Sequence, residues 1–238
     1  MAVKKCRRCL HKLAGMMKTK EALDLKMMRF GKKEWNKFFG DVGEEPPLPK
    51  DLSLTMSQPC PFWPSQKIQD THFLILLPRE IEAQLLTLNT FQSLLINKSK
   101  CSYASFDKFV RQELGNSSIE SHWILMTYDV VPNTRRQRFE AQKSYIESIE
   151  TNDPYRYRLP SVLEATACII AAYLYLGKTI YSDDPWTYTR CMEKVNLDQY
   201  PVSVGGFSNR GVFIHDCRYV PTHDYIGVGA VKSFESVN

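Results

Sequence analysis

The sequence lacks any long apolar run, and this absence limits where the protein can reside. The longest apolar stretches, Phe73 to Pro78 and Ala165 to Leu176, are shorter than the roughly 20 residues that a membrane-spanning helix needs. A secretory signal is also missing, because Lys12, Lys18 and Lys20 interrupt every apolar stretch behind the basic first residues. We therefore expect a protein without membrane spans that does not use the general export pathway.

Cysteine is present but follows no regular pattern. The chain of 238 residues has seven cysteines, an odd number at irregular spacings, so a disulfide framework is not expected. Reduced thiols in an intracellular, cytoplasmic protein fit this usage better. Cys6, Cys9 and His11 resemble the start of a zinc pattern, but no second Cys pair completes four ligands, so we predict no structural metal site.

Motifs of the common enzyme classes are missing as well. No glycine-rich loop leads into a lysine, as phosphate binding would require, and no Gly-x-Ser-x-Gly nucleophile turn occurs. The acidic pair Asp183 and Asp184 stands before Pro185, a pattern more typical of a turn than of a calcium site. These residues alone predict no catalytic group and no cofactor.

Positive charge is concentrated at the N-terminus. Residues 1–40 hold twelve Lys or Arg and three acidic residues, a balance of +9, whereas the remaining 198 residues carry a balance of −4. Apolar residues recur in this segment at spacings of three and four: Val3, Cys6, Leu10, Leu13, Met17, Leu23, Met27 and Phe30. The spacing predicts a basic amphipathic helix over residues 1–37. It would pack on the main domain, bind an anionic membrane surface or partner, or contact nucleic acid through phosphate.

Residues 38–69 differ in composition from the segments on either side. Gly and Pro recur in them without any periodic pattern, which predicts a linker or an extended wrapping segment. Their aromatic residues favour packing against a surface: Phe38, Phe39, Phe62 and Trp63. A globular domain over residues 70–238 follows.

Strand and helix patterns alternate in this domain. Bounded apolar runs predict buried strands at 70–77 and 122–127, and amphipathic patterns predict helices at 88–96, 107–114 and 135–150. Pro160, Ser161 and Glu164 form a helix-start pattern in which the Ser caps and the Glu completes a capping box. A buried helix over 162–176, ended by Gly177, is expected from it.

The stretch Arg158-Leu159-Pro160-Ser161, with Glu164 after it, resembles a family signature. It is similar to the Arg-Leu-Pro-Thr-Glu-Ala-Glu-Trp-Glu motif of the formylglycine-generating enzyme, or sulfatase-modifying factor, family. Gly205-Gly206-Phe207-Ser208 and a closing strand at 226–232 follow in the same order as in that family. The resemblance implies an α+β, C-type-lectin-like fold over residues 70–234, in which the closing strand pairs with the Gly-Gly strand. The sequence also resembles uncharacterised proteins of environmental chlamydiae, which bring no established activity.

The enzymatic activity of that family is not expected to carry over. Formylglycine generation there depends on a close pair of copper-binding cysteines, whereas Cys191 and Cys217 stand twenty-six residues apart here without the flanking pattern. His215 and His223 also lack the spacing of the iron site found in a related branch. A metal-dependent oxidase of the formylglycine-generating type is the alternative function.

The loops after the Arg-Leu-Pro helix carry the residue types that anchor interfaces, since aromatic and Arg side chains combine large contact area with directed hydrogen bonds. We predict a ligand-binding loop face made of Trp186, Tyr188, Arg190, Asn209, Arg210, His215, Asp216, His223 and Asp224. Trp186 is expected to pack under the loop, and Arg210, His215, His223 and Asp224 to be exposed. The predicted function is non-catalytic binding of a protein or glycan, with an anionic partner for residues 1–40.

Overall fold

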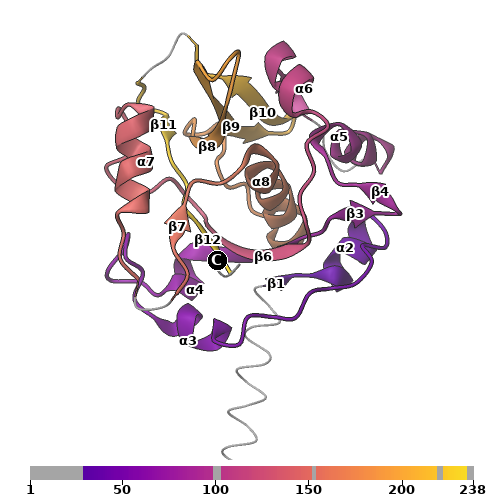
Figure 1. Cartoon of the computed structure of the whole chain (residues 1–238), viewed down its shortest axis with the longest axis horizontal. Helices are drawn as coiled ribbons and strands as arrows, with labels where there is room; N and C mark the ends of the chain where they lie inside the picture. Colours follow the sequence, from indigo (N-terminus) through magenta and orange to yellow (C-terminus); the bar gives the residue numbers. More distant parts are fainter. Residues whose placement is uncertain (1–28, 99–102, 152–153, 219–221, 235–238) are drawn as a thin grey trace, which may run out of the picture.

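Two five-stranded sheets enclose a central helix in this protein. The computed structural model describes residues 29–98, 103–151, 154–218 and 222–234. The helices are α2 (Lys32–Phe38), α3 (Leu52–Ser57), α4 (Ile68–Thr71), α5 (Leu88–Asn97), α6 (Lys108–Leu114), α7 (Phe139–Glu147) and α8 (Val162–Leu176). Figure 1 shows α8 between the sheets, so the fold belongs to the α+β class.

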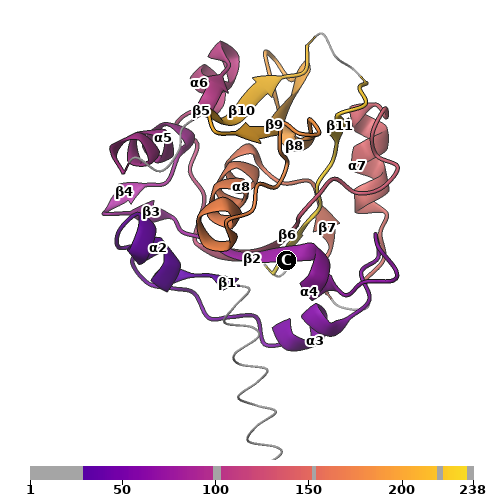
Figure 2. The same cartoon turned by 180° about the vertical axis from the view of Figure 1, so that it is seen from behind.

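The first sheet has the order β1-β2-β6-β12-β7. Its strands are β1 (Arg29–Phe30), β2 (His72–Leu77), β6 (His122–Thr127), β12 (Val231–Ser233) and β7 (Tyr157–Arg158). The strand predicted at 122–127 is confirmed as β6. The strand predicted at 70–77 is confirmed as β2 from His72 onwards, whereas Asp70 and Thr71 belong to α4. β2 and β6 pair antiparallel, with His72 opposite Thr127. All of β2 is buried, because α8 covers one face of the sheet and residues from the N-terminal part cover the other (Figure 2).

The second sheet has the order β11-β8-β9-β10-β5. Its strands are β11 (Ile226–Gly227), β8 (Tyr188–Val195), β9 (Tyr200–Ser208), β10 (Gly211–Asp216) and β5 (Tyr103–Phe106), and a small separate hairpin joins β3 (Glu80–Ile81) to β4 (Gln84–Leu85). β8, β9 and β10 form an antiparallel meander, to which β11 and β5 add as parallel edges.

The closing segment differs from the single strand expected at 226–232. It divides into β11, which pairs with β8, and β12, which pairs with β6 and β7, so neither piece pairs with the Gly-Gly strand β9. Between them the backbone N–H groups of Val228 and Gly229 donate to the hydroxyls of Thr134 and Thr189. These side-chain bonds replace ladder bonds while the chain crosses from one sheet to the other.

The predicted start and end of α8 are confirmed. The Ser161 hydroxyl accepts from the backbone N–H of Glu164 at 3.1 Å, and the Glu164 carboxylate accepts from the backbone N–H of Ser161 at 2.7 Å. Gly177 ends the helix at φ +64°, a left-handed conformation that costs Gly little. The helix is buried from Val162 to Ala172, because it has a sheet on either side.

Residues 38–69 wrap around the first sheet and include α3 and α4. Phe39, Val42 and Phe62 are buried there. Just before this segment, Trp35 of α2 donates its indole N–H to the carbonyl of Leu76 at 2.8 Å, which fixes α2 against β2. Most of the predicted basic helix, residues 1–28, lies outside the described residues, and Phe30 lies in β1.

The helices predicted at 88–96 and 107–114 are confirmed as α5 and α6, but the helix expected at 135–150 is shorter. It begins at Phe139 and ends at Glu147. Asn133 and Arg136 have φ values of +64° and +60°, which a right-handed helix excludes. Among the described residues, none of the helices combines the length and the apolar character that crossing a membrane requires.

Candidate ligand-binding face

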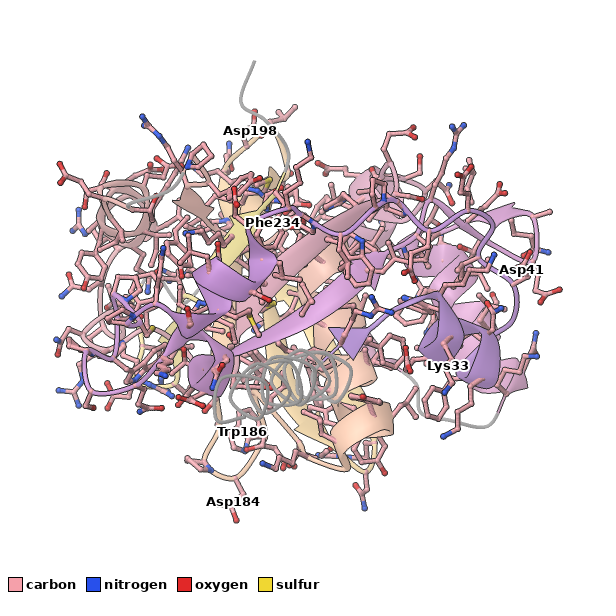
Figure 3. All side chains as sticks on the ribbon, turned by 90° about the horizontal axis from the view of Figure 1, so that it is seen from below. Lys33, Asp41, Asp184, Trp186, Asp198 and Phe234 are labelled. Carbon is pink, nitrogen blue, oxygen red and sulfur yellow. The ribbon has the colours of Figure 1, made fainter. Side chains whose placement is uncertain are left out.

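The loop that follows α8 leaves Trp186 exposed at the molecular surface. Short bridges shape this loop, since Ser182 pairs with Phe207 and Asp183 pairs with Trp186. The Trp186 side chain is 50% exposed, so the expectation that it packs under the loop is wrong. Figure 3 shows Asp184 and Trp186 together at one edge of the molecule, opposite Asp198 in the β8–β9 turn.

Trp186 forms one end of a cluster of rings, which we call the aromatic cluster: Trp186, Tyr188, His215, His223 and Tyr225. The ring centroids of Trp186 lie 6.0 Å from Tyr188 and 5.9 Å from Tyr225. Tyr188 also contacts His215 at 5.1 Å, and His223 lies over Tyr225 at 3.7 Å. The cluster therefore unites the start of β8 and the loop before it with β10 and with the loop that leads into β11.

Gly205 and Gly206 make room for the buried Tyr188. A Cβ atom at Gly205 would lie 2.7 Å from the Tyr188 Cα, and one at Gly206 would lie 2.2 Å from its hydroxyl oxygen. Real Cβ contacts are longer, so only Gly fits beside this ring. Burial, together with the nearby Tyr225 and Asp183, raises the pKa of Tyr188 to about 12, so the phenol stays neutral. The Gly-Gly pair of the sequence motif thus positions the aromatic cluster.

Two consecutive arginines fix the loop that carries His223. Arg136 forms a two-point ion pair with Asp224, with N–O distances of 2.5 and 2.7 Å, and this pair lowers the pKa of Asp224. Arg135 donates to the carbonyl of Asp224 at 3.0 Å and to the Thr187 hydroxyl at 3.2 Å. The residue pattern predicts a helix that includes both arginines, because nothing in the neighbouring sequence indicates that Asp224, 88 residues after Arg136, is their partner.

An open pocket of about 540 Å³ lies beside the exposed Trp186 loop. Its lining combines acidic, amide, hydroxyl and aromatic groups: Tyr173, Thr179, Ser182, Asp183, Asp184, Phe207, Ser208 and Asn209. Within the residues that the structure describes, the carboxylates of Asp183 and Asp184 have no hydrogen-bond or ion-pair partner. Among these lining residues, Asn209 is the only one that belongs to the predicted site. The sequence pattern around Asp183 and Asp184 predicts a turn and gave no sign of a pocket.

Three predicted face residues lie inside the domain: Tyr188, Arg190 and Asp216. Arg190 is buried and donates to the side-chain oxygen of Gln142 at 2.9 Å and to the carbonyl of Gln137 at 3.1 Å, so it joins β8 to α7. Asp216 is buried and accepts from Arg218 at 2.8 Å, which lowers the pKa of its carboxyl. The structure therefore does not expose Tyr188, Arg190 or Asp216 at the predicted ligand-binding face.

The other predicted residues lie at or near the surface. Asn209 and Arg210 are exposed in the turn between β9 and β10, and Asp224 is exposed in its ion pair. His215 and His223 are only half-buried, in contrast to the exposure expected for them. His215 contacts the Ser203 hydroxyl at 3.3 Å, and burial lowers the pKa of its imidazole, which favours the neutral ring.

The two cysteines weighed for metal chemistry are both buried. Cys191 and Cys217 are free thiols, and burial raises the pKa of Cys191 well above its ordinary value. A protonated thiol is a poor ligand and a poor nucleophile. Across the described part of the chain, no group of three His, Cys, Asp or Glu residues is arranged to hold a metal ion.

Comparisons of the chain with protein-family models, with curated proteins and with solved structures found no match.

Proposed function

We propose that this protein is a non-catalytic binding domain whose ligand is a protein, held at the loop face that contains Trp186. The observation that carries the proposal is the exposed indole of Trp186 next to an open pocket lined by the carboxylates of Asp183 and Asp184, which have no partner among the described residues. Large exposed aromatic side chains beside a concave surface are typical anchors of protein interfaces.

The chemistry of the pocket favours a partner with cationic side chains. Ionised carboxylates accept charge-assisted hydrogen bonds, which are about twice as strong as neutral ones. An indole face also attracts Lys and Arg through its quadrupole. The Arg135–Asp224 and Arg136–Asp224 contacts hold the neighbouring loop in place, which lowers the ordering cost of binding.

The proposal can be tested with purified full-length protein and two ligand sets, a peptide array graded in Lys and Arg content and a glycan array. We expect binding to basic peptides, weakened roughly tenfold or more by Trp186→Ala and by Asp183→Asn with Asp184→Asn, since an interface anchor contributes about 2 kcal/mol. Tyr145→Ala is the matched control, because Tyr145 is 42% exposed on α7 and belongs neither to the aromatic cluster nor to the lining of the pocket.

Two results would overturn the proposal. Equal peptide binding by the wild type and Trp186→Ala would remove the loop face as the site. Binding to glycans alone, lost in Trp186→Ala, would keep the face but replace the protein ligand with a carbohydrate.

The other two functions considered from the sequence are not proposed. The metal-dependent oxidase needs accessible thiolates, whereas Cys191 and Cys217 are buried. Binding of nucleic acid or a membrane surface was predicted from residues 1–37, of which 1–28 lie outside the described residues. That role stays a prediction from charge alone.

A further inference from the structure

The start of α8 brings together two carboxyl groups with opposite surroundings. Glu164 lies in the first turn of the helix, and Glu193 reaches the same turn from β8. Helix α8 lies between both sheets (Figures 1 and 2), so its first turn is the place where β6, β7 and β8 meet the helix. The protonation of these groups therefore affects how three strands hold one helix.

Glu164 uses its full capacity as a hydrogen-bond acceptor. Arg158 donates to both carboxylate oxygens, at 2.6 and 2.8 Å, and the backbone N–H of Ser161 donates at 2.7 Å. His122 makes the fourth contact, with its Nε2 atom 3.0 Å from Oε1. A carboxylate offers about four lone-pair sites, so every site is occupied. Although burial opposes ionisation, the bonds from Arg158 and His122 lower the pKa of Glu164, and it is ionised.

The contacts of His122 determine its charge. Its Nδ1 atom lies 2.7 Å from the backbone carbonyl oxygen of Glu120, and its Nε2 atom contacts the ionised Glu164. A carbonyl oxygen and a carboxylate only accept hydrogen bonds, so each ring nitrogen must donate. A neutral imidazole has only one N–H, and the ring must therefore be the imidazolium ion.

Glu193 has surroundings opposite to those of Glu164, because they oppose the ionised form of its carboxyl group. Both of its carboxyl oxygens lie within 3.1 Å of the backbone N of Val162, and its side chain is half-buried. Burial raises the pKa of Glu193 to about 7, and the negative charge of Glu164 adds to this effect, while the Val162 N–H and Arg158 oppose it. The group therefore exchanges its proton near neutral pH.

The other titratable groups around the helix start are buried thiols or members of ion pairs. The thiols of Cys168 on α8 and Cys191 on β8 are buried, which raises the pKa of each. The Glu120 carboxylate, next to the carbonyl that His122 contacts, pairs with Arg79 at 3.4 Å. Lys194, adjacent to Glu193, pairs with Glu140 at 2.7 Å. Arg158 keeps its charge at every relevant pH.

We propose that the start of α8 is a proton-controlled anchor, in which the His122 imidazolium ion ties β6 to Glu164 and gives up this hold when the ring loses a proton. Each proton that His122 or Glu193 releases lowers the net charge of the cluster with Arg158 and Glu164 by one. Loss of the His122 proton removes a charge-assisted hydrogen bond, and ionised Glu193 repels Glu164. The first turn of α8 opens more readily as the pH rises, whether or not the loop face holds a ligand.

The first test is the protonation state of His122 in the full-length protein. Nitrogen-15 NMR of the labelled imidazole distinguishes one N–H from two. We expect both ring nitrogens to be protonated at pH 6. A ring with a single protonated nitrogen at pH 6 would overturn the proposal, and this measurement needs no variant.

The second test measures opening at the helix start by hydrogen exchange of the Ala165 amide, which donates to the Ser161 carbonyl at 2.9 Å. After correction for the intrinsic pH dependence, we expect its protection to fall roughly tenfold between pH 6 and pH 8, the equivalent of one charge-assisted hydrogen bond. The double variant His122→Gln, Glu193→Gln cannot titrate at either position, so its protection should change less than about threefold over the same range. Equal pH dependence in wild type and double variant would overturn the proposal.

Discussion

Replacement of Glu164 with Gln is the most informative perturbation of the core. The carboxylate holds the Arg158 guanidinium, the His122 ring and the Ser161 N–H at once. Gln has one acceptor oxygen and one NH₂ group, so at least one of these donors would face another donor. The substitution changes shape very little, and its effect on stability therefore reports the charge and the hydrogen bonds.

The expected loss of unfolding free energy is about 3 kcal/mol at pH 7. Removing one partner of a buried ion pair costs about 3–5 kcal/mol, because the other charge stays buried without compensation. The Glu164 side chain is 3% exposed, whereas Arg158 is 28% exposed, so water would partly solvate the remaining cation. This partial exposure favours the lower end of the range.

Equilibrium unfolding in urea, followed by circular dichroism, measures this loss. Glu140→Gln is the matched control, since it removes the same charge from a surface pair with Lys194 in which Glu140 is 70% exposed. Exposed pairs contribute about 0.2–1 kcal/mol, so the control should stay within about 1 kcal/mol of wild type. If Glu164→Gln lost no more than the control, the account of a saturated, buried carboxylate would be refuted.

Two further predictions concern buried and glycine positions. Burial lowers the pKa of His72 to about 3, so below about pH 6.5 the unfolded chain binds a proton at this position before the folded protein does. The free energy of unfolding should therefore fall as the pH drops from about 6.5 towards 3. Urea unfolding midpoints measured at pH 7, 5 and 4 should fall less steeply in His72→Phe than in the wild type. Gly206→Ala should destabilise the protein more than Gly177→Ala, because both have positive φ but only Gly206 would place a Cβ 2.2 Å from the Tyr188 hydroxyl oxygen. Strain alone costs about 1 kcal/mol, so thermal unfolding midpoints that agree for the two variants would contradict the steric argument.

The sequence was most informative where the signal is local. The capping box of Ser161 and Glu164 spans three residues and predicts the start of α8 without reference to the rest of the chain. The apolar runs that became β2 and β6 were equally clear, because a strand buried on both faces must be apolar throughout. These features determined that a buried helix and two central strands exist.

The start of α7 shows why local patterns are not sufficient. Residues 135–138 resemble helix in sequence, yet Arg136 adopts φ +60° and binds Asp224, 88 residues further along the chain. Likewise, nothing near Trp186 in the sequence indicates that Tyr188 fills the space beside it and leaves the indole at the surface. Long-range ion pairs and packing decide such positions, and neither is encoded in residue spacing.

The sequence by itself therefore determined the buried helix α8, the central strands β2 and β6, and the concentration of positive charge in residues 1–40. Only the tertiary structure decided which residues form a site. It buried Tyr188, Arg190 and Asp216, placed Trp186 near the carboxylates of Asp183 and Asp184, and brought His122 and Glu193 to one helix start. The physical reason is that burial and partner geometry set the charge and exposure of a side chain, and both depend on contacts between segments far apart in the chain.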